Sequence, residues 1–296
     1  MRRTNRFIGL WAGAVALVAL LVIGYLVTNR AARPADVTAA RVALGQRLLA
    51  ERRLSADGRR SCFSCHQPER GFTDGRAVAT PGGLNTPPLW GLGERQVFGW
   101  FSPEMRSLEA MALRPLDDPA EMGPRSAAIL ARLRADADLL AAYRAAFPGA
   151  AEAITWDQTG AALAAALRAI EPPPGAYARY LAGERAALSA AARRGQALFI
   201  EVGCAVCHRP PSFDSDSFHN IGLPADPARN SGRARVPGLR GVRYTAPYFH
   251  DGSAATLEQV VRHYARGGGP GASPAITPLN LTDADIRDLV AFLESL

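Results

Sequence analysis

The sequence contains no lysine, and its four cysteines are confined to two short strings. The positive side of the formal net charge of +7 is therefore arginine alone. No arginine-rich arm of the kind that binds nucleic acid is present, so no nucleic-acid partner is expected. No segment of any length alternates apolar and polar residues, which argues against a fold built from half-buried strands. With no cysteine outside the two strings, no further disulfide framework can form.

The cysteine strings are Cys62-Phe63-Ser64-Cys65-His66 and Cys204-Ala205-Val206-Cys207-His208. Cys-x-x-Cys-His is the attachment signature of c-type haem: the thiols form thioether bonds to the porphyrin, and the histidine supplies an axial nitrogen to the iron. The sequence therefore predicts two covalent haem c groups. They are held by Cys62, Cys65, Cys204 and Cys207, with His66 and His208 as proximal ligands.

Other uses of paired cysteines fit less well. Zinc ribbons separate their two pairs by about 15–20 residues, whereas more than a hundred residues lie between these. A thioredoxin-like dithiol needs a βαβ pattern, which is not visible, and would not explain the histidine after each pair. Zinc and structural disulfides stay open as alternatives to haem.

The N-terminus carries the longest apolar run. Ile8–Val27 is a stretch of 20 residues without a charge, long enough to cross a bilayer as a helix. Arg2, Arg3 and Arg6 precede it, which places the N-terminus in the cytoplasm and the body outside. The alternative is a cleaved signal peptide, whose apolar core is usually about 7–15 residues. The longer run favours an uncleaved inner-membrane anchor, and both readings place the body in the periplasm.

Apolar periodicity predicts a mostly helical protein. The expected helices are Pro34–Leu54, Ser107–Ala112, Pro124–Phe147, Trp156–Ile170, Leu188–Ile200 and a last one that begins at Thr282. Long stretches rich in glycine and proline lie between them, at Gly71–Gly99, Arg209–Gly241 and Gly267–Pro278. Loops of this length are uncommon unless functional, and here they are expected to wrap the haem groups, with at most a short hairpin.

A short motif is repeated before the two haem strings. Leu44-Gly45-Gln46-Arg47-Leu48 is echoed by Arg194-Gly195-Gln196-Ala197-Leu198, each in a predicted helix. Two cytochrome c-like domains in tandem are therefore expected, with Pro172–Gly175 as the boundary. The predicted division is a membrane anchor or signal peptide over 1–33, an N-terminal haem domain over 34–171 and a C-terminal haem domain over 176–296.

Several longer motifs point to a known family. They are Leu54–Gly58, Gly71–Gly75, Asp117–Gly123, Val236–Arg240 and Thr245–Gly252, which includes Phe249-His250-Asp251-Gly252. With these motifs the chain resembles the bacterial dihaem cytochrome c peroxidases and their relative MauG over about residues 36–296. The resemblance implies that the N-terminal haem reacts with peroxide and that the C-terminal haem transfers electrons.

The resemblance also implies distal residues at the first haem. Its segment places a glutamate at Glu121 and a proline at Pro115, and Glu121 is the candidate for acid–base work. A surface carboxylate at a helix start is the plainer interpretation of Glu121. Four residues before the proline the family has a glutamine, whereas this chain has Met111, which cannot donate a hydrogen bond.

At the second haem the resemblance implies a further iron ligand after the Phe-His-Asp-Gly motif. The family usually has methionine at this place, MauG has tyrosine, and this chain has Tyr264. A phenolate would stabilise oxidised iron, whereas methionine raises the potential. The neighbouring His263 is an alternative ligand, and simple packing of Tyr264 near the haem is another.

A calcium ion between the haem groups is also implied by the resemblance. Matching positions are the side chain of Asn85 and the carbonyls of Thr245 and Pro247, whose oxygens suit calcium; a turn role for Asn85 is equally open. The family's inter-haem tryptophan string is lost, and Trp100 or Phe101 stands near its place.

Two further histidines, His219 and His250, are expected to be hydrogen-bonded structural residues rather than ligands. A few arginines are expected to pair with haem propionates, but the sequence does not say which.

The function that the resemblance implies is that of a dihaem peroxidase, which is expected to reduce hydrogen peroxide with electrons from a small periplasmic cytochrome c or cupredoxin. One alternative is a MauG-like enzyme that oxidises residues of a partner protein. Another is a dihaem electron carrier without catalysis, which would be favoured if both irons had two strong protein ligands.

Overall fold

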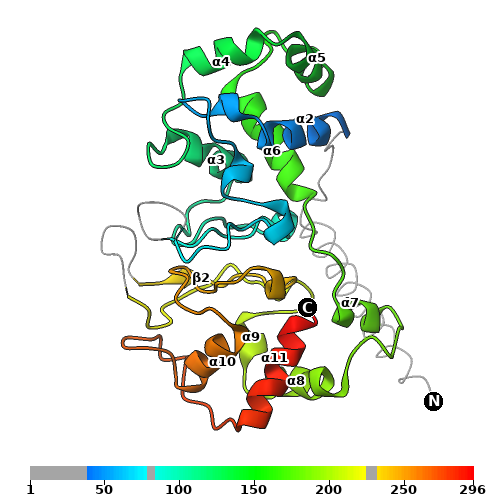
Figure 1. Cartoon of the computed structure of the whole chain (residues 1–296), viewed down its shortest axis with the longest axis vertical. Helices are drawn as coiled ribbons and strands as arrows, with labels where there is room; N and C mark the ends of the chain where they lie inside the picture. Colours follow the sequence, from blue (N-terminus) through cyan, green and yellow to red (C-terminus); the bar gives the residue numbers. More distant parts are fainter. Residues whose placement is uncertain (1–38, 79–83, 225–231) are drawn as a thin grey trace, which may run out of the picture. The chain divides into compact units, whose positions relative to one another are not determined.

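The computed structural model describes residues 39–78, 84–224 and 232–296 (Figure 1). They belong to one unit, Thr38–Leu296. The expected membrane span Ile8–Val27 and the start of the first predicted helix at Pro34 lie outside these residues. Across the described ranges, no helix has both the length and the apolar content to span a membrane.

The first half of this unit is a group of helices coloured blue and green in Figure 1. Its helices are α2 (Ala39–Leu49), α3 (Leu108–Leu113), α4 (Ala127–Arg134), α5 (Ala137–Ala146) and α6 (Trp156–Arg168). Helix α6 packs against both α2 and α3. Fully buried leucines fill the space between these helices, among them Leu44, Leu48, Leu133, Leu139 and Leu163.

The second half forms a separate apolar core. Its helices are α7 (Ala176–Leu181), α8 (Ala190–Glu201), α9 (Cys204–Cys207), α10 (Leu257–Ala265) and α11 (Asp283–Glu294). Three aromatic rings pack edge to face in this core, those of Phe199, Phe213 and Phe292, with centroids 5.3–6.0 Å apart. The strands β1 (Phe218–His219) and β2 (Ala234–Arg235) pair antiparallel, with Phe218 opposite Arg235. This pair is the short hairpin that the sequence allowed.

Short 3₁₀ turns connect these helices. They are η1 (Arg52–Leu54), η2 (Cys62–Ser64), η3 (Pro68–Arg70), η4 (Leu92–Glu94), η5 (Arg114–Asp117) and η6 (Val242–Tyr244). Most of the remaining described chain is irregular. The mostly α class with long loops is therefore confirmed.

The repeated motif marks equivalent helix crossings in the two halves. Gly45 of α2 faces α6, and Gly195 of α8 faces α11. At each crossing the partner backbone occupies the space where a Cβ would be, so only glycine allows the two helices to approach this closely. The two halves thus share the same close helix–helix contact at the glycine of the repeated motif.

Helix boundaries follow capping side chains. Thr282 and Asp285 form the expected capping box at the start of α11, and Ser107 caps α3. The single helix predicted over Pro124–Phe147 is wrong, because Asp136 accepts a hydrogen bond from the Leu139 amide (2.9 Å) and starts a second helix there. An aspartate favours a helix start because its short carboxylate accepts a hydrogen bond from a backbone amide that has no partner within the helix.

Candidate haem sites and their surroundings

A cavity of about 410 Å³ lies beside the first cysteine string. Its wall includes the three residues of the attachment signature and the three residues expected on the distal side: Cys62, Cys65, His66, Met111, Pro115 and Glu121. Segments about fifty residues apart in sequence therefore meet around one hollow, as the resemblance implied. The volume falls in the range of cofactor and ligand sites in proteins.

The imidazole of His66 is held by the main chain. Its Nδ1 lies 3.0 Å from the carbonyl oxygen of Phe72; because a carbonyl can only accept, Nδ1 carries the proton. Nε2 is then the nitrogen with a lone pair for iron. Burial lowers the pKa of His66, which keeps the ring neutral. Phe72 adopts φ 59° to present this carbonyl, a conformation that is uncommon for a residue with a side chain.

The second string repeats this arrangement. His208 Nδ1 lies 3.2 Å from the carbonyl oxygen of Phe213 and 3.1 Å from that of Pro237, and Phe213 has φ 55°. Burial lowers the pKa of His208 as well. Each string is followed by a loop closed by a β-bridge, Gln67 with Thr73 and Arg209 with Asp214. Two similar loops thus orient two histidines in the same way.

The thiols are available for haem attachment. All four cysteines are unpaired, and burial raises the pKa of Cys62 to about 12 and that of Cys204 to about 11. Within the described ranges, no three His, Cys, Asp or Glu side chains are grouped to hold a metal ion. With each string next to a histidine whose Nε2 is turned free by a main-chain acceptor, the residues present fit haem c at both strings.

Glu121 lies close to the first string. Its charge raises the pKa of both Cys62 and Cys65, and its side chain is half-buried in the cavity wall. The turn that carries it is closed by the Glu121 amide, which donates to the carbonyl of Asp118 (3.0 Å). This is not a surface position at a helix start, because Glu121 follows the 3₁₀ turn η5 and precedes α4 by several residues.

Tyr264 lies close to the second string. Burial, above all, and the nearby Cys204 and Cys207 side chains raise its pKa. The alternative ligand His263 is engaged elsewhere, because its Nε2 lies 2.7 Å from the carbonyl oxygen of Ile221. Phe249 packs against both rings, with centroids 5.0 Å from His263 and 6.2 Å from Tyr264. Of the two candidates, Tyr264 is the one whose side chain interacts with the string residues, and its role as an iron ligand stays a prediction.

Comparison with known proteins agrees with this geometry. Residues 39–186 match the family described as di-haem cytochrome c peroxidase, and residues 192–296 match cytochrome c. The chain is 36% identical to the methylamine utilization protein MauG of Methylorubrum extorquens, over 88% of this chain and 79% of that protein. It is 34% identical to the cytochrome-c peroxidase IdrP1 of Denitromonas iodatirespirans, over 89% and 83%. This chain belongs to the dihaem cytochrome c peroxidase family.

Solved structures of the family superpose well on the chain. A MauG-like protein associated with microbial copper homeostasis gives a TM-score of 0.77 at 35% identity, covering 88% of this chain and 89% of that one. The dihaem peroxidase BthA of Burkholderia thailandensis gives 0.71 at 26% identity, covering 87% and 86%. Family membership makes this chain an oxidoreductase of the peroxidase type that binds two haem c groups.

The candidate calcium residue Asn85 is hydrogen-bonded through its side chain and its main chain. Asn85 is buried, and its Nδ2 donates to the carbonyl of Arg76 (2.8 Å). Its own carbonyl accepts from Trp100 Nε1 (3.2 Å), and its amide donates to the carbonyl of His250 (2.8 Å). Thr245 is buried as well, and a cis peptide precedes Pro247. Their role at a calcium ion stays a prediction.

The two remaining histidines differ from each other. His219 behaves as expected, because its Nε2 lies 3.1 Å from Ser217 Oγ and 3.8 Å from Cys207 Sγ. His250 is buried against Phe101, with ring centroids 5.2 Å apart, and its Nδ1 has no hydrogen-bond partner among the described residues. The expectation of a hydrogen-bonded ring is therefore wrong at that nitrogen.

A buried charge cluster was missed by the sequence analysis. Arg95 and Arg235 both bind the carboxylate of Asp214, at 2.6 Å and 2.7 Å. Both arginines also line the first cavity. The sequence offers one indication. Asp214 lies in the loop after the second string, and Arg235 directly precedes the Val236–Arg240 motif. Nothing in the sequence pairs either of them with Arg95.

Proposed function

We propose that the protein reduces hydrogen peroxide with electrons from a small periplasmic cytochrome c or cupredoxin. The observation that carries this proposal is the difference between the two haem sites. Glu121 lies in the wall of the first cavity, whereas Tyr264 lies beside the second string. A carboxylate that can move protons suits a catalytic site, and a phenolate bound to iron would stabilise its oxidised state.

Reduction of one hydrogen peroxide consumes two electrons and two protons and releases two water molecules. Haem bound through Cys62 and Cys65 supplies redox-active iron at the first site. Glu121 takes the proton from one peroxide oxygen and delivers it to the leaving oxygen. The Phe72 carbonyl fixes the orientation of His66. Pro115 and Met111 give that part of the wall side chains without hydrogen-bond donors.

At the second site His208 and Tyr264 are the two iron ligands. The Phe213 and Pro237 carbonyls hold His208, so that its Nε2 is the coordinating nitrogen. Tyr264 binds as phenolate, since a metal ion lowers the pKa of a coordinating group that burial would otherwise raise. A ligand of this kind favours the oxidised state of the site.

The second candidate function is a MauG-like oxidation of residues in a partner protein. Tyr264 is the observation that favours it, together with the 36% identity to a MauG protein. Met111 does not favour it, and neither does the loss of the inter-haem tryptophan string. A non-catalytic dihaem carrier is the third possibility, and an open iron coordination position at the first site would contradict it.

Three further features belong to the proposed function. The body lies in the periplasm, anchored in the inner membrane by an uncleaved helix at Ile8–Val27. Asn85, Thr245 and Pro247 hold one calcium ion, for which the oriented amide of Asn85 is the support. The proposed domain boundaries are 34–171 and 176–296, whereas the two family matches divide later in the chain, on either side of residues 187–191.

The test uses full-length protein matured with haem c. Absorbance and electron paramagnetic resonance spectra are recorded first, and one high-spin iron with an open position is expected. Turnover is then measured with hydrogen peroxide and a reduced soluble cytochrome c as the donor. Glu121→Gln is expected to lower kcat at least about 100-fold, whereas Glu104→Gln, which removes an exposed carboxylate, leaves it unchanged.

Two outcomes separate the alternatives. Two six-coordinate low-spin irons and no peroxide turnover would identify an electron carrier. A rapid reaction with peroxide but no turnover with any small reduced cytochrome or cupredoxin would instead identify an enzyme whose electrons come from a partner protein, as in the second candidate function.

A further inference from the structure

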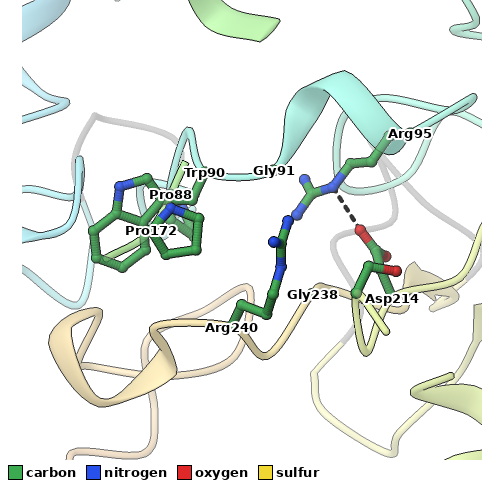
Figure 2. A pocket seen from close by; sticks show the side chains of 9 residues that line it. Pro88, Trp90, Gly91, Arg95, Pro172, Asp214, Gly238 and Arg240 are labelled. Atoms are coloured by element: carbon green, nitrogen blue, oxygen red, sulfur yellow. Dashed lines mark hydrogen bonds and ion pairs between the residues drawn. The ribbon is translucent and has the colours of Figure 1, made fainter. Parts of the chain in front are cut away.

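Two buried guanidinium groups share one carboxylate between the haem strings. Arg95 Nε lies 2.6 Å from Asp214 Oδ2, and Arg235 Nη1 lies 2.7 Å from Asp214 Oδ1. The three side chains are only 11%, 6% and 10% exposed for Arg95, Arg235 and Asp214. Figure 2 shows the Arg95–Asp214 pair beside Arg240, around a small cavity of about 20 Å³. One buried carboxylate cannot neutralise two buried cations, and the other carboxylate that acts on Arg95, Asp216, is exposed to water.

The buried charge is incompletely compensated. Burial and, after it, the neighbouring Arg235 lower the pKa of Arg95 to about 10, although Asp214 and the exposed Asp216 act in the opposite direction. Nε of Arg235 is buried and has no hydrogen-bond partner among the described residues. A buried donor left without a partner costs about 1–3 kcal/mol. The cluster therefore has both the charge and a donor for an anion.

The anion would come from the first cavity. Arg95 and Arg235 belong to its wall, together with Cys62, Cys65 and His66. Of the other arginines of this wall, Arg76 is exposed and Arg60 is half-buried, with 43% of its side chain accessible, so water can screen their charge. A haem attached at Cys62 and Cys65 carries two propionate carboxylates, and a planar guanidinium binds a carboxylate through two parallel hydrogen bonds.

We propose that Arg95 and Arg235, linked by Asp214, bind a propionate of the haem at the first string. This inference adds the anchoring residues to the proposed function and depends on haem being attached there. The propionate supplies the negative charge that the two arginines and one carboxylate lack, and its oxygens accept from the unpartnered Arg235 Nε.

The same cluster connects the two haem sites. Asp214 directly follows Phe213, and Arg235 lies two residues before Pro237. The carbonyls of Phe213 and Pro237 are the two acceptors of His208 Nδ1. A propionate at the first haem is thereby bound by residues whose backbone orients the proximal ligand of the second. The cluster consists of positioning residues, and it affects both iron potentials through charge.

The test measures the reduction potentials of both haem groups in the full-length holoprotein. Arg235→Gln removes a positive charge, so the ferric state gains stability and the potential of the first haem falls. A tenfold change in the reduction equilibrium is expected, about 59 mV for a one-electron couple. Asp214→Asn removes a negative charge and is expected to raise the potential instead. Opposite signs at two residues in contact are not expected from a general loosening of the structure.

Two more variants complete the design. Arg235→Lys keeps the charge but not the planar fork, so the potential is retained while the propionate bending mode in the resonance Raman spectrum shifts. Arg179→Gln is the matched control, because Arg179 pairs with Glu184 at the surface and is 51% exposed. Its potentials and Raman spectrum are expected to equal those of the unsubstituted protein.

Haem content distinguishes the possible failures. It is measured by mass spectrometry of each variant before any potential is compared. Unsubstituted protein without porphyrin on Cys62 and Cys65 would overturn the proposed function itself. Full haem content with potentials and Raman modes of Arg235→Gln equal to those of Arg179→Gln would overturn the propionate assignment and leave the peroxidase proposal standing. Haem loss confined to the Arg235 variants would support the anchoring role.

Discussion

Gly45 of α2 lies so close to α6 that a Cβ at this position would be 1.9 Å from the carbonyl oxygen of Ala162. Gly195 of α8 has the same relation to Asp288 of α11, also at 1.9 Å. Both glycines belong to the motif that precedes each haem string. The helix that leads into a string is therefore held against a later helix of the same half by direct backbone contact. Each haem string is then positioned relative to its own apolar core.

Replacing either glycine is expected to separate the helices. Gly45→Ala and Gly195→Ala should each lower the free energy of unfolding by about 3 kcal/mol or more, because a backbone carbonyl cannot move aside as a side chain can. Thermal or denaturant unfolding of the holoprotein measures this effect. Gly160→Ala in α6 is the comparison: a Cβ there would lie 2.9 Å from Leu113 Cδ1 and 3.2 Å from the Glu109 carbonyl oxygen, so a smaller loss is expected, partly offset by a gain in helix propensity of about 1 kcal/mol. Equal losses at all three sites would contradict the explanation.

Substitution of Tyr264 is expected to change the second haem alone. Tyr264→Met should raise its reduction potential by about 60 mV or more, since methionine favours reduced iron. Tyr264→Phe should leave an iron coordination position open and add a high-spin signal to the electron paramagnetic resonance spectrum. Tyr180→Phe, a half-buried tyrosine of α7, should change neither property. A low-spin spectrum retained in Tyr264→Phe would show that another residue binds this iron.

Calcium removal is expected to act through Asn85. Its Nδ2 donates to the Arg76 carbonyl, which leaves Oδ1 as the side-chain oxygen for the ion, and amide and carbonyl oxygens suit calcium. Metal analysis should find one calcium in the unsubstituted protein, and a chelator should lower its thermal stability. Asn85→Ala should contain no calcium and should not respond to the chelator, whereas Asn280→Ala, at an exposed asparagine, should behave as the unsubstituted protein. Calcium retained in Asn85→Ala would refute the site.

Acid is expected to weaken the first half through Glu51. Its carboxylate accepts from Arg53 at 2.8 Å and 2.6 Å, and this hydrogen bonding lowers the pKa of Glu51 below its ordinary 4.5. A lowered carboxyl pKa stabilises the fold above pH 4.5, and the contribution is lost as the pH falls from there through the folded-state value. Because the pair is partly exposed, the loss should not exceed about 1 kcal/mol.

Denaturant unfolding at pH 7 and pH 3.5 measures this contribution. Glu51→Gln should be less stable than the unsubstituted protein at pH 7 and should show a smaller difference between the two pH values. Glu69→Gln, which removes an exposed carboxylate, serves as the control. An unchanged pH dependence in Glu51→Gln would mean that other carboxylates carry the acid response.

The sequence alone determined the chemistry that local spacing encodes. A thiol pair and a histidine within five residues define a haem attachment site wherever the chain places them, so Cys62, Cys65 and His66 were readable without a fold. The helical class and the start of α11 at Thr282 were also readable, because apolar periodicity and capping act within a few residues. The repeated Gly-Gln motif indicated two related halves for the same reason.

Tertiary structure decided the relations between segments distant in the sequence. The carbonyls of Phe72 and Phe213 contact the histidines in loops where both phenylalanines adopt a positive φ. No local sequence pattern predicts this conformation for phenylalanine. The Arg95–Asp214–Arg235 cluster joins residues more than a hundred positions apart. Such pairs form because a buried charge is stable only beside a partner of opposite charge. The sequence indicates which residues form the apolar cores, but not which charged residues the packed cores bring together.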